Sequence, residues 1–256
     1  MIAYELNDDE VARSARAVNR NPDLTLHLKG GGIKFIGGAL YIDCPNKNGY
    51  RAQSQPFKID NFNVGDKDIT ITARILTEVS GPKKRIVTKR SNPSSGEQGS
   101  QGYSIYLDDG VPVFQLGMNV TVMGTSKVND GTWHTLVGVR DRSNHEMRLY
   151  VDGMLQARGE DNSQMLDNDG DFQLGAFYEL APNGTNYCGA LKDVSLFQRT
   201  LSPEEISRFT HDPDSLASMT RLKASNCTVD LFAIQFATNY YFVFRITSTC
   251  KRQWWQ

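Results

Sequence analysis

The chain has 256 residues, 39% of them hydrophobic and 10% aromatic, which is enough to bury the core of one large domain or of two small ones. Its 28 basic and 29 acidic residues give a net charge of -1, so the basic excess of a duplex-binding surface is absent and nucleic acid is not an expected partner. The four cysteines include no Cys-x-x-Cys pair, which argues against zinc and thioredoxin-like redox sites.

The N-terminal segment, residues 1–22, carries a weak helical pattern. Asn7 suits an N-cap, acidic residues follow it, and apolar residues up to Val18 recur at helical spacing, so one short helix is predicted from Asn7 to Val18. The first residues lack the basic and apolar regions of a secretory signal. Three glycosylation sequons nevertheless begin at Asn119, Asn183 and Asn226. We therefore expect a secreted or extracellular protein only if a leader was removed.

Strand patterns begin at Leu24 and recur up to Leu116. Alternating apolar residues over Ile69–Ile75 predict a strand with one buried face, and Asp109-Gly110 is a tight turn between two more strands. The glycine run at residues 30–32 lacks the spacing of a phosphate-binding loop and is interpreted as a turn. The basic run Lys83–Arg85 is interpreted as a solvated hairpin tip. Residues 91–102 are a polar loop.

A hairpin from Asp130 to Gly159 is the most regular part of the sequence. Trp133, Val137 and Val139 share one side of a period-two pattern, so Trp133 is expected to be a core anchor and His134 to point the opposite way. Asp152-Gly153 is a second tight turn. No serine or cysteine near a histidine has the context of a nucleophile, so a catalytic triad is not expected.

The C-terminal third contains one clear helix start. Ser202 is an N-cap, Pro203 takes the first helical position and Glu205 completes a capping box. Beyond it, residues 213–256 form an extension. Its apolar stretch Val229–Ile246 is interrupted by polar and charged residues, so a membrane span is not expected. We predict one or two added strands there, with a Cys227–Cys250 disulfide as one option, or a tail that the core does not need.

Strands at roughly ten-residue spacing, without long intervening helices, predict an all-β fold: an antiparallel β-sandwich or jelly roll with one short C-terminal helix. Three motifs, which lie in Asp130–His134, Arg148–Gly153 and Gly189–Ile206, occur in an order and spacing that resembles the laminin-G-like jelly roll of the concanavalin A-like lectin/glucanase superfamily. The resemblance covers about residues 24–209. We assign residues 23–212 to this domain, and it implies a concanavalin A-like sandwich.

Catalysis is not the favoured function. Glycosidases of this superfamily carry alternate carboxylates on one strand, and two such groups must flank the scissile bond; this chain has no such strand. Three acidic residues alternate around a glycine turn instead: Asp167, Asp169 and Asp171. A solvated turn is the simpler interpretation and a cation site the alternative. Many laminin-G-like modules hold a calcium ion, and the resemblance therefore makes Ca²⁺ the expected cofactor if there is one.

The preferred hypothesis is a non-catalytic module that binds a glycan or protein ligand through loops at the sandwich edge or through the concave sheet face. Candidate contacts are Tyr178, Asn183, Tyr187 and the loop of residues 91–102, because aromatic rings stack on sugars and amides bond their hydroxyls. Two alternatives remain: an accessory lectin-like domain of a larger glycoside hydrolase such as a sialidase, and a structural scaffold subunit.

Overall fold

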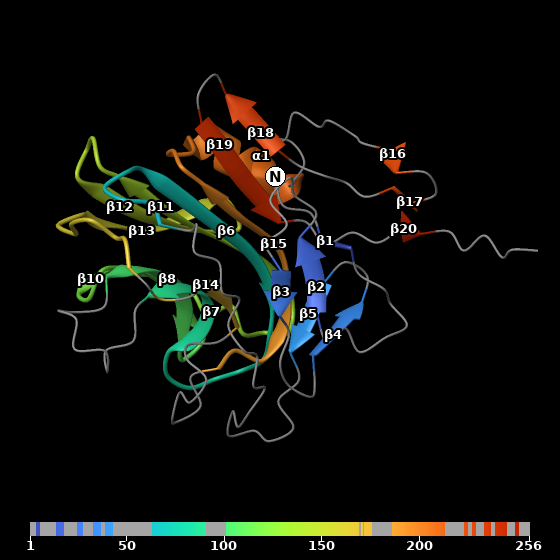
Figure 1. The fold of residues 1–256 in the computed structure, drawn as a ribbon. Helices are drawn as coiled ribbons and strands as arrows, with labels where there is room; N and C mark the ends of the chain where they lie inside the picture. The colour runs from blue at the N-terminus through green and yellow to red at the C-terminus, as the bar shows by residue number, and fades with distance from the viewer. Residues whose placement is uncertain are drawn as a thin grey trace, which may run out of the picture.

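The computed structural model describes residues 39–42, 63–90, 101–168, 170, 172–175 and 186–212 in full, and elsewhere only the backbone of the short strands named below. The central part of the chain consists of two facing antiparallel sheets (Figure 1). The smaller sheet has five strands in the order β10-β9-β8-β7-β14. Their bounds are Val120–Met123 (β10), Val111–Leu116 (β9), Gly102–Asp108 (β8), Lys84–Arg90 (β7) and Phe172–Leu174 (β14).

The larger sheet has nine strands, of which seven follow the order β13-β12-β11-β6-β15-β19-β18, while β5 pairs with β15 and β4 with β5. Their bounds are Met154–Glu160 (β13), Glu146–Val151 (β12), Trp133–Asp141 (β11), Ile69–Leu76 (β6), Gly189–Phe197 (β15), Asn239–Phe244 (β19), Ala233–Phe236 (β18), Ala39–Ile42 (β5) and Ile33–Ile36 (β4). The predicted all-β antiparallel sandwich is confirmed.

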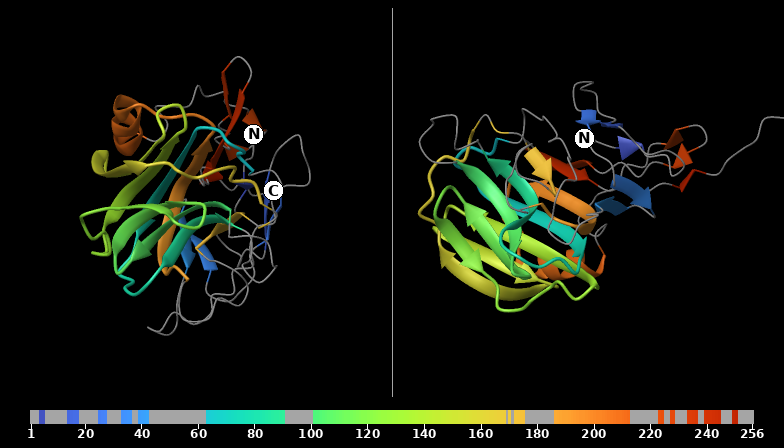
Figure 2. Two further views of the ribbon diagram at one scale, coloured as in Figure 1. Left: turned by 90° about the vertical axis from the view of Figure 1, so that its left-hand side faces the viewer. Right: turned by 90° about the horizontal axis from the view of Figure 1, so that it is seen from below.

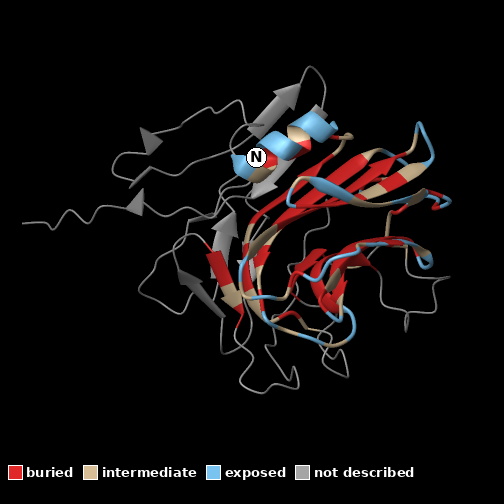
Figure 3. Cartoon of the chain, turned by 180° about the vertical axis from the view of Figure 1, so that it is seen from behind, coloured by how far each residue is buried: buried red, intermediate tan, exposed pale blue. Residues whose placement is uncertain are grey.

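The main core lies between the two sheets (Figures 2 and 3). Ile71 and Leu149 of the larger sheet face Ile105 and Phe114 of the smaller one, and all four are at most 1% exposed. The sheets approach closely at Gly138, where an added Cβ would lie 2.6 Å from Cδ2 of Phe114. Only glycine leaves room for the ring at this position.

The hairpin β11–β12 forms as expected, but the predicted facing of its first strand is wrong. Leu136, not Val137, belongs to the core between the sheets. Val137 and Val139 lie on the opposite face of the sheet, in a second apolar cluster with Ile206 of the helix. The middle of β11 is therefore buried on both faces, which is why hydrophobicity alone could not assign its phase.

Trp133 is on that outer face and is only partly buried, so it is not a core anchor. The ammonium group of Lys192 lies 4.3 Å from the centroid of its ring, a cation–π contact. His134 is on the inner face at the end of the strand, where its ring bridges two carboxylates: Nδ1 is 2.6 Å from Asp152 and Nε2 is 3.1 Å from Asp130.

The helix α1, Pro203–His211, has the capping box that the sequence predicts. Ser202 Oγ accepts a hydrogen bond from the backbone of Glu205, and the Glu205 carboxylate accepts one from the backbone of Ser202. Ile206 and Phe209 are buried, and the Phe209 ring meets that of Phe197 edge-on at 6.5 Å. The helix therefore covers part of the outer face of the larger sheet.

The two ends of the chain differ in part from expectation. Ser14–Ala17 is a strand (β2) that pairs with Tyr4–Glu5 (β1) and Thr25–His27 (β3), so a helix over Asn7–Val18 is wrong at these positions. At the other end, β19 joins the larger sheet as an added strand. A separate three-stranded sheet contains Lys223–Ala224 (β16), Cys227–Thr228 (β17) and Thr249–Cys250 (β20).

One cysteine of the described residues, Cys188, is disulfide-bonded. Cys227 and Cys250 are register partners on neighbouring strands, and a disulfide between them stays a prediction. No helix in the described residues is long and apolar enough to cross a membrane.

Candidate functional site

Polar side chains gather on the outer face of the five-stranded sheet. Each strand places apolar residues such as Val87 and Ile105 toward the core, so the residues between them point outward. The outward set, which we call the polar face, consists of Arg85, Thr88, Arg90, Ser104, Tyr106 and Gln115. All six are buried, with exposed fractions of 8% or less. Buried polar groups on an outer sheet face are unusual and point to a specific role.

Arg85 is the centre of the polar face. Its Nη1 donates hydrogen bonds to Ser104 Oγ at 3.0 Å and to Gln115 Oε1 at 3.4 Å. Its guanidinium carbon lies 4.4 Å from the centroid of the Tyr106 ring. The arginine thus stacks on one residue of β8, bonds to another residue of β8 and bonds to one residue of β9, so its position is fixed by three contacts.

The neighbouring hydroxyl and amide groups are also held in place. The hydroxyls of Thr88 and Ser104 are 3.0 Å apart, and Ser104 Oγ donates to the carbonyl of Val87. Gln115 Nε2 donates to the carbonyl of Met118 at 2.7 Å. These bonds fix the rotamers of side chains that carry both donors and acceptors, and such pre-organisation reduces the entropy lost when a polar ligand binds.

Tyr106 keeps its proton at neutral pH. Burial raises the pKa of its hydroxyl, Asp108 raises it further, and the nearby cations Arg85 and Arg90 act in the opposite direction without reversing the shift. The hydroxyl therefore keeps a proton that it can donate in a hydrogen bond, while the ring is stacked against the Arg85 guanidinium.

The interpretation of the basic run Lys83–Arg85 as a solvated hairpin tip is wrong for two of its three residues. Lys83 is exposed in the turn, but Lys84 and Arg85 are only 5% and 6% exposed and belong to β7. A register shift between Arg85 and Val87 places Ile86 out of alternation, and this bulge conceals the phase of the strand. The alternation of polar residues in β8 was the signal that could have identified the face.

The two segments that contain the predicted ligand contacts are anchored beside the polar face. Arg90 and Gly102, which flank residues 91–101, are register partners. Residues 176–185 connect Gly175 to Asn186; the amide of Gly175 donates to the carbonyl of Ile86, and Asn186 forms a bridge with Arg85. The candidate contacts Tyr178 and Asn183 and residues 91–100 of the loop lie outside the fully described residues.

Tyr187 occupies a different kind of position. Its side chain is completely buried, and its hydroxyl oxygen lies 3.0 Å from the carbonyl oxygens of both Leu76 and Ala190, either of which can accept its one proton. Burial raises the pKa of this hydroxyl. Tyr187 is therefore a core residue that links β6 to β15, and its placement does not suit the predicted role as a ligand contact.

Of the three candidate metal ligands, only Asp167 is described; Asp169 and Asp171 lie outside the described residues. Asp167 Oδ1 accepts a hydrogen bond from the amide of Gly65 at 2.5 Å. The ammonium group of Lys89 reaches the same turn and donates to the carbonyls of Asn168 and Gly170. Within the described part of the chain, no three His, Cys, Asp or Glu side chains form a group that could hold a metal ion. Calcium binding stays a prediction.

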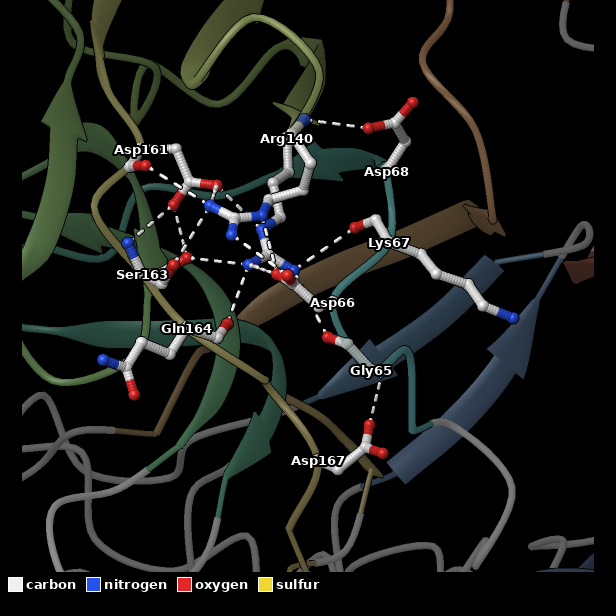
Figure 4. A network of polar contacts seen from close by, with 10 residues as sticks. Gly65, Asp66, Lys67, Asp68, Arg140, Asp161, Ser163, Gln164 and Asp167 are labelled. Carbon is white, nitrogen blue, oxygen red and sulfur yellow. Dashed lines mark hydrogen bonds and ion pairs between the residues drawn. The ribbon is translucent and has the colours of Figure 1, made fainter.

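A second polar cluster was not foreseen from the sequence (Figure 4). Arg140, completely buried, bonds Asp161 Oδ2 at 2.9 Å and Asp66 Oδ1 at 3.0 Å. Arg142 bonds the same two aspartates from the surface side. Hydrogen bonds from Ser163 and Arg140 lower the pKa of Asp161 more than its burial raises it. Because the buried charges are paired within the cluster, it ties the end of β11 to residues 65–67 and 161–164 and is best explained as structural.

Comparison with known proteins identifies one family and several solved structures of similar fold. A family model described as the concanavalin A-like lectin/glucanases superfamily matches residues 51–207. No curated protein matches the sequence. The binding domain of Paraclostridial Mosquitocidal Protein 1 is 15% identical, over 86% of this chain and 53% of that one, with a TM-score of 0.55. The chain thus spans about half of that structure's length.

Two further solved structures are similar. Domain 4 of AbnA, an extracellular arabinanase from Geobacillus stearothermophilus, solved with arabinotriose, is 15% identical over 71% of this chain and 82% of that one, with a TM-score of 0.52. A Trypanosoma rangeli sialidase in complex with 2,3-difluorosialic acid is 13% identical over 84% of this chain and 32% of that one, with a TM-score of 0.58. At these identities the likeness establishes the fold.

Proposed function

The chain belongs to the concanavalin A-like lectin/glucanases superfamily, and from this premise we propose that it is a non-catalytic module that binds glycans at the polar face. The observation that carries the proposal is Arg85, stacked on Tyr106 and hydrogen-bonded to Ser104 and Gln115. A fixed guanidinium, hydroxyls and an amide beside an aromatic ring are the groups that recognise the hydroxyls and the apolar faces of sugars.

A ligand at this face would replace contacts that now bury the side chains. Arg85 and Tyr106 are each 6% exposed, so a sugar would not find them on an open surface. Binding then requires rearrangement of neighbouring chain, which slows association relative to a preformed site. We propose that residues 91–102, Tyr178 and Asn183 contribute to the ligand contacts. Residues 91–101 join β7 to β8, and residues 176–185 join Gly175, which follows β14, to Asn186, which forms a β-bridge with Arg85.

The proposal extends to location and cofactor. A disulfide at Cys188 suits an oxidising compartment, which supports a secreted or extracellular protein. Calcium, with Asp167, Asp169 and Asp171 as ligands, is proposed as an optional structural ion of the turn that follows residue 166. Both proposals are independent of the polar face.

The direct test is a glycan array with the purified protein, run with calcium and with a chelator, followed by affinity measurements on the best ligand. Arg85→Gln removes the charge and the stacked guanidinium, whereas Arg158→Gln removes an arginine whose side chain is 63% exposed on the other sheet. Loss of a hydrogen bond to a charged group, worth about 1.5–3 kcal/mol, predicts roughly 10- to 100-fold weaker binding for Arg85→Gln. Arg158→Gln should bind normally.

Two results would overturn glycan binding at the polar face. One is the absence of binding to any glycan under either calcium condition, which would favour a protein ligand or a scaffold role. The other is unchanged affinity in Arg85→Gln when its thermal unfolding shows that it is folded. Tyr106→Phe, which removes only the hydroxyl, keeps the test informative if Arg85→Gln does not fold. Hydrolysis of the bound glycan would contradict the non-catalytic assignment.

A further inference from the structure

The outer edge of β15 has two different partners along its length. Gly189–Leu191 pairs with β5, and Val194–Leu196 pairs with β19. The two partner strands therefore lie end to end on the same edge. β5 is nearly 200 residues away from β19 in the sequence, so the second half of this edge depends on a strand supplied by the C-terminal extension.

A bulge marks the point where the partner changes. The register between β15 and β6 shifts between Lys192 and Ser195, and Asp193 has a φ of +49°, in the left-handed region that non-glycine residues rarely adopt. Thr72 Oγ1 donates to the Asp193 carbonyl and so stabilises the bulge from the neighbouring strand. The edge beyond the bulge is thus a distinct unit.

The strand that carries this edge is part of the core. Val194 and Leu196 belong to the main apolar cluster, and Phe197 to the cluster under α1. Without β19, a row of backbone N–H and C=O groups beside buried side chains would be unpaired, and such an edge accepts any strand of suitable sequence. The β15 edge at Val194–Leu196 therefore needs a partner strand.

The sequence of β19 suits exchange between molecules. Asn239–Phe244 contains only aromatic and β-branched residues after Asn239, with no charge, glycine or proline, which is the composition of segments that pair readily in sheets. It forms a hairpin with β18, and the segment that joins this hairpin to α1 includes β16 and β17 of the small sheet. The residues between α1 and β16, 212–222, can span roughly 35 Å when extended, which is enough to reach a neighbouring molecule.

We propose that β19 is an exchangeable strand, and that the β15 edge at Val194–Leu196 accepts Asn239–Phe244 from a second copy of this chain. The same register would form within one chain or between two, so the backbone hydrogen bonds are equal in both states. The balance is then set by protein concentration and by the entropy of the connecting segment. Reciprocal exchange gives a closed dimer and leaves no additional edge unpaired.

Engineered cysteines at facing positions test this in the full chain. Ser195 and Val243 are register partners, and side chains directly opposite on antiparallel strands are close enough for a disulfide. Ser195→Cys and Val243→Cys proteins, each checked for folding by thermal unfolding, are mixed at increasing concentration and oxidised. Ser195→Cys mixed with Tyr241→Cys, two residues out of register, is the matched control. The double variant Ser195→Cys/Val243→Cys reports pairing within one chain.

Exchange predicts a reducible covalent dimer of the matched pair, at least tenfold more abundant than the control and increasing with concentration. If the double variant closes its bridge within one chain while the matched mixture gives no more dimer than the control, the strand does not exchange and the proposal is wrong. If the double variant forms no bridge either, the β15–β19 register is absent, which also overturns it. Should these variants not fold, the next register pair, Val194→Cys with Phe244→Cys, gives the same comparison.

Discussion

Replacement of Arg140 by methionine is expected to lower the free energy of unfolding by about 3–5 kcal/mol, because it removes one member of a buried ion pair and leaves the other without its closest partner. Arg140 and Asp161 are both completely buried, at 2.9 Å. The guanidinium also donates to an aspartate, a serine hydroxyl and three backbone carbonyls: Asp66, Ser163, Gly65, Lys67 and Gln164. Methionine fills a similar volume but satisfies none of these acceptors.

Arg142→Met is the matched control. Its side chain is 22% exposed and its closest carboxylate, that of Asp66, is 51% exposed, so its loss should cost no more than about 1 kcal/mol. Urea unfolding at pH 7 measures both variants. The double variant Arg140→Met/Asp161→Leu should recover much of the loss, because it removes the unpaired charge along with its partner.

The pH dependence separates the unpaired charge from lost packing. The pKa of Asp161 is lowered in the native protein: burial raises it, but hydrogen bonds from Ser163 and Arg140 lower it more. Its stabilising contribution is therefore present above the unfolded value of 3.8 and is lost as pH falls through the lower folded pKa. The difference between wild type and Arg140→Met should narrow on acidification. A loss below about 1 kcal/mol at pH 7, or a difference independent of pH, would refute this reasoning.

Three further predictions concern single residues. Burial lowers the pKa of His134, but hydrogen bonds to its two carboxylate neighbours raise it more, so the net pKa lies above 6.5; its stabilising contribution should be complete below pH 6.5 and disappear as pH rises through the folded pKa, and His134→Gln should abolish this dependence in urea unfolding. Ser202→Ala removes the N-cap oxygen and should cost about 1 kcal/mol by the same method, whereas unchanged stability would mean that the cap contributes nothing. Gly138→Ala, whose Cβ would lie 2.6 Å from the Phe114 ring, should destabilise by about 1–3 kcal/mol in thermal unfolding.

Local sequence signals predicted those elements whose determinants are local. The turn at Asp109-Gly110 and the capping box at Ser202 depend on residues within a few positions of each other, and both form as expected. The facing of β11 depends instead on what lies over each face. Val137 is buried under α1 and Leu136 in the main core, so both faces read as apolar and the pattern could not distinguish them.

The polar face was not predicted from the sequence, for a related reason. A single bulge between Arg85 and Val87 shifts the strand by one residue, so the basic run appears as a charged tip although two of its members lie within a sheet. The same device recurs at Asp193 in β15, where it divides one strand edge between two partners. In both places a bulge, which a periodic pattern does not reveal, positions a proposed functional feature. The first bulge positions the stacked Arg85, and the second marks the part of the β15 edge that pairs with β19.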